Sequence, residues 1–130
     1  MLKQDFIARV QRAAALESPK EALRMARTVL TALRELLPDS ESRRQFATQL
    51  PGALKAHIAS RPPRSLLMDR DAFLQHVGAG LGARAPEAER AVLAVWTVVR
   101  EAMASGEIAD FEARAPKDVV ALLRRAGARR

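Results

Sequence analysis

Residues 18–37 read SPKEALRMARTVLTALRELL, and this stretch decides the fold class. Its apolar residues recur every three or four positions, which is the spacing of one face of an α-helix. Ser18 is a favourable N-terminal cap, Pro19 suits the first helical position, and Glu21 is placed to bond back to the start of the helix. The stretch therefore predicts a long amphipathic helix that ends at about Leu37.

The face opposite this apolar stripe is basic. Its cations recur at the spacing of a helix face, and they are Lys20, Arg24, Arg27 and Arg34. Such a row can follow a line of phosphates, and each contact adds salt dependence to the binding. It is equally typical of a solvated face whose charges are partly paired with acids on neighbouring helices. Both interpretations stay open at the level of the sequence.

The chain also repeats itself once. The offset between matched residues falls from 67 to 66 to 65 along the chain, as two single-residue deletions in loops would produce. The matched pairs are Phe6 and Phe73, Val10 and Val77, Arg34-Glu35 and Arg100-Glu101, Phe46 and Phe111, and Pro51 and Pro116.

Each copy predicts four helices, and no stretch alternates with the period of a strand. We expect these helices at about residues 3–15, 19–37, 40–48 and 51–60, then 70–81, 86–103, 107–114 and 116–125.

Arg61-Pro62-Pro63-Arg64 cannot continue a helix. We therefore expect a linker at residues 61–64, between a first repeat of about 1–60 and a second of about 65–130. The predicted fold is all-α, with two pseudo-symmetric four-helix repeats that share one helical-bundle core in a single domain, residues 1–130.

Two features near the start of the second copy have simple interpretations. Gly78, Gly80 and Gly82 look superficially like a nucleotide-binding loop, but they follow a predicted helix rather than a strand. We expect them to end that helix and form a loop. His76 matches Arg9, a position expected to be exposed, so it should be a surface histidine.

Composition excludes several kinds of chemistry. The 130 residues include no Cys and two His, so disulfides, zinc–thiolate sites and a Cys nucleophile are excluded, and an all-His metal site lacks ligands. We expect no catalytic residue, no cofactor and no metal, and therefore no enzyme. A small-molecule enzyme would need a buried cleft with perturbed carboxylates between the two copies.

The balance of charge favours an anionic partner. Lys and Arg number 22 against 15 Asp and Glu, for a net charge of +7. Nucleic acid is one such partner. No apolar run approaches the roughly 20 residues of a membrane span, and the N-terminus does not resemble a signal peptide, so we expect a cytoplasmic protein.

Two further candidate surfaces lie in the second copy. The C-terminal arginines would be a phosphate-binding tail or a helix end whose charge suits the helix dipole. Leu93 and Trp96 lie at the margin of the predicted apolar face, where they would form a partner patch or part of the core. The tail arginines are Arg124, Arg125, Arg129 and Arg130.

The repeated residues resemble a known family. They are similar to the prokaryotic family catalogued as domain of unknown function 2267, and the resemblance covers nearly the whole chain. It rests on Phe6, Val10, Arg34-Glu35, Gln49-Leu50-Pro51, Phe73, Val77 and Arg100-Glu101. The second copy departs from the pattern, because Arg114-Ala115-Pro116 replaces Gln-Leu-Pro. The resemblance implies a helical protein with two repeats and implies no activity.

We therefore expect a non-enzymatic helical interaction or scaffold module that binds a second copy or another protein. The alternative is a protein that binds the phosphate backbone of nucleic acid without sequence preference. An exposed apolar patch around Leu93 and Trp96 would favour the first hypothesis. A basic face free of acids would favour the second.

Overall fold

The computed structural model describes residues 1–52, 54–55, 66 and 68–128. The described part contains helices and no strand, so the prediction of an all-α fold is confirmed. The helix predicted over 51–60 lies mostly outside the described residues, and the linker at 61–64 lies wholly outside them. The helices are α1 (Lys3–Ala13), α2 (Pro19–Glu35), α3 (Ser40–Thr48), α5 (Arg70–Leu81), α6 (Ala85–Ala102), α7 (Ser105–Arg114) and α8 (Lys117–Ala128).

The start of α2 has the capping contacts that its sequence predicts. The Ser18 hydroxyl oxygen accepts a hydrogen bond from the Glu21 backbone N–H at 3.2 Å, and Pro19 is the first helical residue. Glu21 bonds back to the residue before the cap, since its Oε2 accepts from the Glu17 N–H at 3.2 Å. The Ser18 contact satisfies an amide that the first turn of a helix leaves without a partner, and the Glu21 contact fixes the chain that enters the helix.

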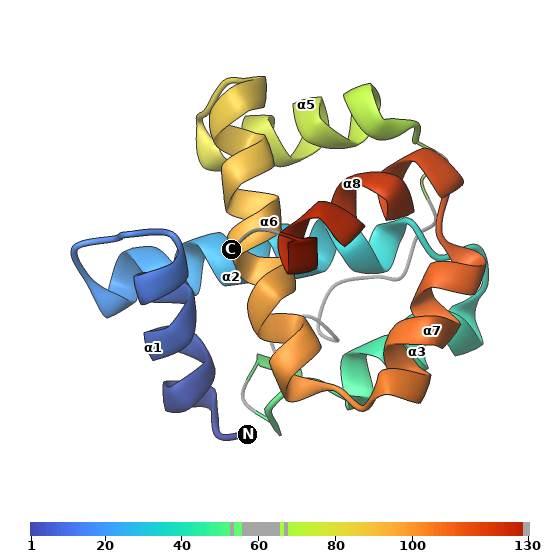
Figure 1. Cartoon of the computed structure of the whole chain (residues 1–130), viewed down its shortest axis with the longest axis horizontal. Coiled ribbons are helices and arrows are strands. Elements are labelled where there is room, and N and C mark those ends of the chain that lie inside the picture. The colour runs from blue at the N-terminus through green and yellow to red at the C-terminus, as the bar shows by residue number, and fades with distance from the viewer. Residues whose placement is uncertain (53, 56–65, 67, 129–130) are drawn as a thin grey trace.

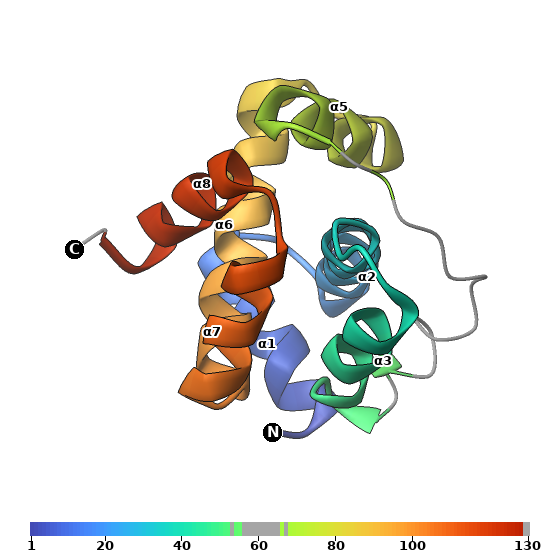
Figure 2. The same ribbon diagram turned by 90° about the vertical axis from the view of Figure 1, so that its right-hand side faces the viewer.

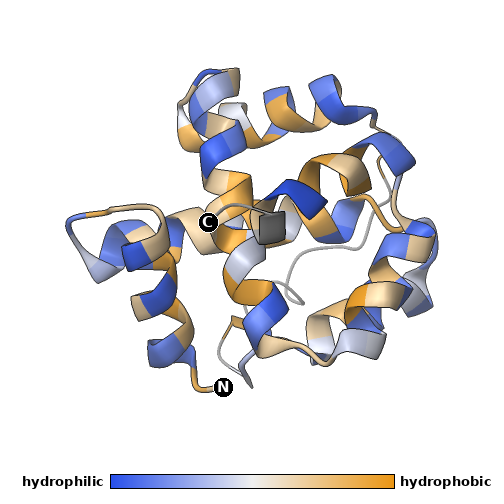
Figure 3. Ribbon diagram, viewed as in Figure 1, coloured by the Kyte–Doolittle hydropathy of each residue, from blue (hydrophilic) through white to orange (hydrophobic). Residues whose placement is uncertain are grey.

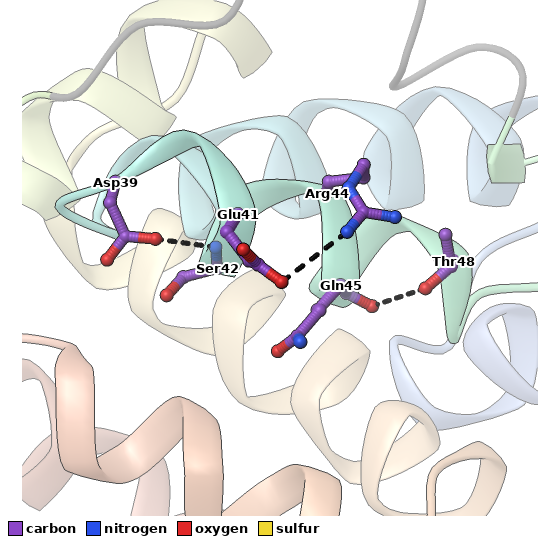
Figure 4. Close-up of polar contacts among 6 residues, drawn as sticks. All are labelled: Asp39, Glu41, Ser42, Arg44, Gln45 and Thr48. Carbon is purple, nitrogen blue, oxygen red and sulfur yellow. Dashed lines mark hydrogen bonds and ion pairs between the residues drawn. The ribbon is translucent and has the colours of Figure 1, made fainter.

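Aspartates begin two other helices. Oδ1 of Asp39 accepts from the Ser42 N–H at 2.7 Å and begins α3, a contact that Figure 4 shows. Oδ1 of Asp69 accepts from the Ala72 N–H at 2.8 Å and begins α5. Both helices have the bounds expected from the sequence, because a capping side chain fixes a helix start more sharply than periodicity does.

The two longest helices, α2 and α6, cross at the centre of the molecule (Figures 1 and 2). Helix α6 contacts α1, α2, α5 and α8, and α2 contacts α1, α3 and α5 as well as α6. Helix α3 also packs against α7. Figure 3 shows apolar and hydrophilic residues alternating along the helices, as amphipathic packing requires.

One apolar core takes residues from all seven described helices. Phe6 of α1 and Phe73 of α5 are fully buried, as is Trp96 of α6. Burying one large apolar side chain contributes about 1.5–3 kcal/mol. The core therefore joins the two halves of the chain.

The glycines at the end of α5 correct one expectation. Gly82 has a φ of +67° and ends the helix, as predicted, but Gly78 and Gly80 lie inside α5. A Cβ on Gly80 would lie 2.7 Å from Cγ2 of Thr28 in α2. These positions lack side chains because neighbouring backbone and side-chain atoms approach too closely, not because the helix has ended.

Candidate functional site

Three of the four predicted α2 cations form an exposed row. Lys20, Arg24 and Arg27 are exposed, and none forms an ion pair within the described part of the chain. Nη2 of Arg24 donates to the Gly80 carbonyl oxygen at 3.4 Å, at the C-terminal end of α5. That contact orients the guanidinium without a neutralising carboxylate. We call Lys20, Arg24 and Arg27 the α2 basic row.

Several other arginines are ion-paired. In those pairs the nitrogen and the carboxylate oxygen lie 3.0–3.8 Å apart. Arg12, Arg84, Arg100 and Lys117 are also exposed without an ion pair to a described acid, so the α2 basic row is distinguished by having three such cations on one helix. The pairs are Arg9–Glu101, Arg44–Glu41, Arg90–Glu87, Arg124–Glu112 and Arg125–Glu89.

Arg34 does not share this exposed face, which corrects the prediction for it. Its residue exposure is 6%, because α3 packs against α2 and the Leu66 N–H donates to the Glu35 carbonyl oxygen at 2.7 Å. Burial lowers the pKa of Arg34, and the positive charge of Arg43 lowers it further. Arginine nevertheless stays charged in proteins.

The predicted C-terminal tail is part of the helical body as far as it is described. Arg124 pairs with Glu112 of α7 at 3.3 Å, and Arg125 pairs with Glu89 of α6 at 3.1 Å. These two arginines are therefore partly neutralised. Arg129 and Arg130 lie outside the described residues.

The predicted partner patch is buried, which corrects that interpretation. Leu93 is 7% exposed and Trp96 is 0% exposed. Helices pack against α6 from several sides, so a residue at the margin of its apolar face still lies inside. The Trp96 ring packs on Phe111, with centroids 5.1 Å apart. In the described chain, the exposed large apolar side chains are Met1 and Leu2.

Sequence reasoning missed a pair that includes His76. Its Nε2 lies 2.9 Å from Oε1 of Glu35, so His76 is a half-buried partner and not a surface histidine. A second pair joins Nη1 of Arg9 to Oε1 of Glu101 at 3.0 Å. Arg9 and His76 are related by the offset of 67, and Glu35 and Glu101 by 66. The signal was therefore present in the sequence, as a basic residue and an acidic residue at matching offsets in the two halves.

A small hollow, open to solvent, lies between α3 and α7. The residues that line it come from positions 65 or 66 apart in the sequence, one from each half of the chain. These positions are Leu37 and Met103, Ser42 and Glu107, Gln45 and Asp110, Phe46 and Phe111, and Gln49 and Arg114.

The two walls of this hollow differ in charge. The polar side chains of the α3 wall are neutral. In Figure 4 the side-chain amide of Gln45 makes none of the drawn contacts, whereas its backbone carbonyl oxygen accepts from the Thr48 hydroxyl. The α7 wall carries Glu107, Asp110 and Arg114. Neither carboxylate has a hydrogen bond or ion pair with a described residue. Nη1 of Arg114 donates to the Asp110 carbonyl oxygen at 3.2 Å.

Asp39 lies at the Arg114 end of this hollow. The Ser42 backbone N–H holds the pKa of Asp39 below its ordinary value, and the Ser42 hydroxyl and the charge of Arg114 act in the same direction. Arg114 therefore has an acidic neighbour, whereas Glu107 and Asp110 have no cationic side chain paired with them.

The fold and these surfaces define an all-helical protein with a basic row and a separate, partly acidic hollow. No three or more His, Asp or Glu of the described ranges lie together as metal ligands would. None of the described helices combines the length and apolarity that crossing a membrane requires.

Comparison with known families agrees with the resemblance inferred from the sequence. The chain belongs to the family described as "Uncharacterized conserved protein (DUF2267)", which it matches over residues 3–122. No curated protein matches the chain.

Proposed function

We propose that this protein is a non-catalytic binding module that contacts the phosphate backbone of nucleic acid through the α2 basic row. The observation that carries the proposal is the set of three exposed cations without carboxylate partners in the described chain. The competing hypothesis of an apolar partner patch loses its support because Leu93 and Trp96 are buried.

The spacing of the row suits a polyanion. At 1.5 Å per residue, Lys20 and Arg27 are separated by about 10 Å along α2. That distance allows contacts to two or three neighbouring phosphates. Aromatic residues make up 4% of the chain, so few side chains are available to stack on unpaired bases. Contacts to phosphates position a protein on nucleic acid but do not read its sequence.

The test is fluorescence anisotropy with labelled random-sequence duplex DNA. We expect wild type to bind with a dissociation constant of about 10⁻⁴ to 10⁻⁶ M at physiological salt, and more tightly at low salt. Arg24→Glu/Arg27→Glu should weaken binding by about tenfold or more. The matched control is Arg44→Glu/Arg90→Glu, which makes the same charge change at ion-paired arginines. No binding at low salt would refute the proposal, and equal losses in both variants would show that net charge alone acts.

Salt dependence provides a second measurement. If all three cations contact phosphates, the logarithm of the association constant should fall with the logarithm of salt concentration with a slope of about −2.7. The Arg24→Glu/Arg27→Glu variant should show a shallower slope. Duplexes rich in A·T and in G·C pairs should bind equally, because the contacts are to the backbone.

We also propose that the two halves are pseudo-symmetric four-helix repeats within one domain. The packing supports this, since α1 contacts α2 and α6 while α5 contacts α6 and α2. The ring centroids of Phe46 and Phe111, which are 65 positions apart, lie 5.2 Å from each other. The double exchange Arg9→His/His76→Arg tests the proposal, since equivalent positions should accept each other's side chains with little change in stability.

The ends of α1 and α5 support the same proposal. Ala15 has a φ of +54° and Gly82, 67 positions later, has a φ of +67°. The next residue after each, Leu16 or Ala83, donates its N–H to a carbonyl five positions earlier at 2.9 Å. The two helix ends thus share a left-handed residue followed by an N–H that bonds five positions back.

A further inference from the structure

We propose that the carbonyl oxygen of Gly80 positions Arg24 for contact with a phosphate, so that Arg24 orients the nucleic acid while Lys20 and Arg27 add charge. This inference rests on the proposed function of the α2 basic row and deepens it. It gives one member of the row a role that needs a guanidinium group, and it makes the junction of α2 and α5 part of the interface.

Arg24 differs from the other two cations of the row because another helix holds its side chain. Nη2 of Arg24 donates to the Gly80 carbonyl oxygen at 3.4 Å. The side chains of Lys20 and Arg27 have neither a hydrogen bond nor an ion pair with a described residue. All three residues are exposed, so all three can reach a polyanion. Of the three, Arg24 is the one whose charged group has a preferred direction before the polyanion arrives.

The Gly80 carbonyl is available to Arg24 because it lies in the last turn of α5. The last four carbonyls of a helix have no partner within that helix. The N–H groups of Gly82 and Ala83 both bond to the Gly78 carbonyl and leave that of Gly80 to another donor. Carbonyls at this end of a helix carry partial negative charge, which stabilises a cation beside them. Arg24 therefore supplies from α2 a donor that the end of α5 lacks.

The absence of a side chain at Gly80 brings its carbonyl within reach of α2. Arg24 and Thr28 are four residues apart and therefore lie on the same face of α2. A Cβ on Gly80 would lie 2.7 Å from Cγ2 of Thr28. Two separate contacts thus place the Gly80 backbone directly against this face. A larger residue at position 80 would move α5 away and lengthen the contact to Arg24.

A guanidinium group can bond the carbonyl and a phosphate at the same time. It carries five N–H groups in one plane, and the Gly80 contact uses one of them. The remaining N–H groups can bond two oxygens of one phosphate, a geometry that a guanidinium matches. The ammonium of a lysine is a single nitrogen on a flexible stem, so it cannot hold both partners in a fixed geometry. A positive charge alone therefore does not replace Arg24.

Holding the guanidinium in the free protein also lowers the entropic cost of binding. A long side chain loses rotamer freedom when it becomes fixed on a partner, and this loss opposes binding. Arg24 has already lost part of that freedom through its contact with Gly80. We expect this preorganisation to strengthen binding by about two- to tenfold.

The test compares two substitutions that conserve charge. In fluorescence anisotropy with random-sequence duplex DNA at physiological salt, Arg24→Lys should raise the dissociation constant by about threefold or more. Arg27→Lys is the matched control and should raise it by less than about twofold, because Arg27 has no contact in the described chain that a lysine would lose. Both variants keep the number of cations, so the salt slope should stay that of wild type.

A double-mutant cycle separates positioning from a general disturbance of the fold. Gly80→Ala should weaken DNA binding by about threefold, because it moves the carbonyl away from Arg24. In an Arg24→Ala background the same substitution should have almost no effect, since no guanidinium remains to be held. Adding Thr28→Ala to Gly80→Ala should recover part of the affinity. The Trp96 emission spectrum verifies that each variant is folded in the assay.

Two results would overturn the inference although wild type binds DNA. One is an equal affinity of Arg24→Lys and Arg27→Lys, and the other is an equal loss from Gly80→Ala with and without Arg24. If Gly80→Ala does not fold, the comparison of the two lysine variants still decides. Absence of binding by wild type would instead refute the proposed function, and this inference with it. Whether wild type binds therefore tells the two failures apart.

Discussion

Nε2 of His76 lies 2.9 Å from Oε1 of Glu35, and this contact joins α5 to the last residue of α2. The Glu35 side chain is 9% exposed, and its backbone oxygen also accepts from the Leu66 N–H. The corresponding pair of Arg9 and Glu101 is open to solvent, with side-chain exposures of 45% and 47%. The two contacts have similar lengths but different environments, and their contributions to stability should differ accordingly.

We expect His76→Ala to lower the free energy of unfolding by about 1–2 kcal/mol, because it removes a partner from a carboxylate shielded from water. Arg9→Ala should lower it by less than about 1 kcal/mol, since exposed ion pairs contribute little. Urea denaturation followed by Trp96 fluorescence measures both. Equal losses in the two variants would contradict the prediction.

The double exchange Arg9→His/His76→Arg tests the equivalence of the two positions. Both pairs are retained with their partners exchanged, so stability should stay within about 1 kcal/mol of wild type. A loss larger than the sum for His76→Ala and Arg9→Ala would show that the two positions are not structurally equivalent. The same denaturation measurement applies.

Gly80 permits the close approach of α5 to α2. In Gly80→Ala the new Cβ would lie 2.7 Å from Thr28 Cγ2, and a β-branched side chain has little freedom to move aside. We expect a loss of about 1–3 kcal/mol in the free energy of unfolding. Thermal and urea denaturation provide the measurement.

Two variants separate this clash from helix propensity. Gly106→Ala in α7 introduces a Cβ that meets no atom within 4 Å, so it should be neutral or slightly stabilising. Adding Thr28→Ala to Gly80→Ala removes the obstructing methyl group and should recover part of the loss. If Gly80→Ala is as stable as wild type, Thr28 moves more easily than its branching suggests.

Asp39 makes the stability of the protein depend on pH. Its pKa is held below the ordinary value of 3.8, chiefly by the Ser42 backbone N–H. The folded state therefore favours the charged carboxylate, and this stabilisation is complete above the unfolded pKa and disappears as pH falls through the lower folded pKa. Asp39→Asn keeps a capping oxygen but removes the charge.

The difference in urea midpoint between wild type and Asp39→Asn should be constant from pH 7 to about pH 5 and should shrink towards pH 3. Asp39→Ala removes the cap altogether, so part of its loss should persist at every pH. A difference between wild type and Asp39→Asn that grows on acidification would have the wrong sign.

The caps of α1 and α5 predict opposite effects of opposite substitutions. Ala15 and Gly82 both have left-handed backbones, which only glycine adopts without strain. Ala15→Gly should raise the free energy of unfolding by about 0.5–1 kcal/mol, and Gly82→Ala should lower it by about 1 kcal/mol. Denaturation of both variants checks this, and a loss in Ala15→Gly would mean that unfolded-state entropy outweighs the relieved strain.

Most of the fold was predictable because local signals set the helix ends. Ser18, Asp39 and Asp69 cap their helices as their residue types suggest. The interior glycines of α5 were misassigned to a loop because helix propensity is local, whereas the contact of Gly80 with Thr28 depends on tertiary packing.

The surfaces were harder to predict. Periodicity placed Arg34 with Lys20, Arg24 and Arg27 on one face of a helix, but exposure depends on which neighbours cover each part of that face. For the same reason the margin of α6 that holds Trp96 is interior. The hollow between α3 and α7 could not be predicted, because one helix does not specify which other helix it faces.

The contact between Phe46 and Phe111 makes the packing at two positions far apart in the sequence depend on each other. The size of each ring limits the space that is left for the other, although the two positions are 65 residues apart in the sequence. A change in the volume of one ring must therefore be accommodated at the other. Lys20 and Pro86, 66 positions apart, are both exposed, so neither position constrains the volume of the other. For Phe46 and Phe111, a substitution that preserves the packing at one position depends on which residue occupies the other.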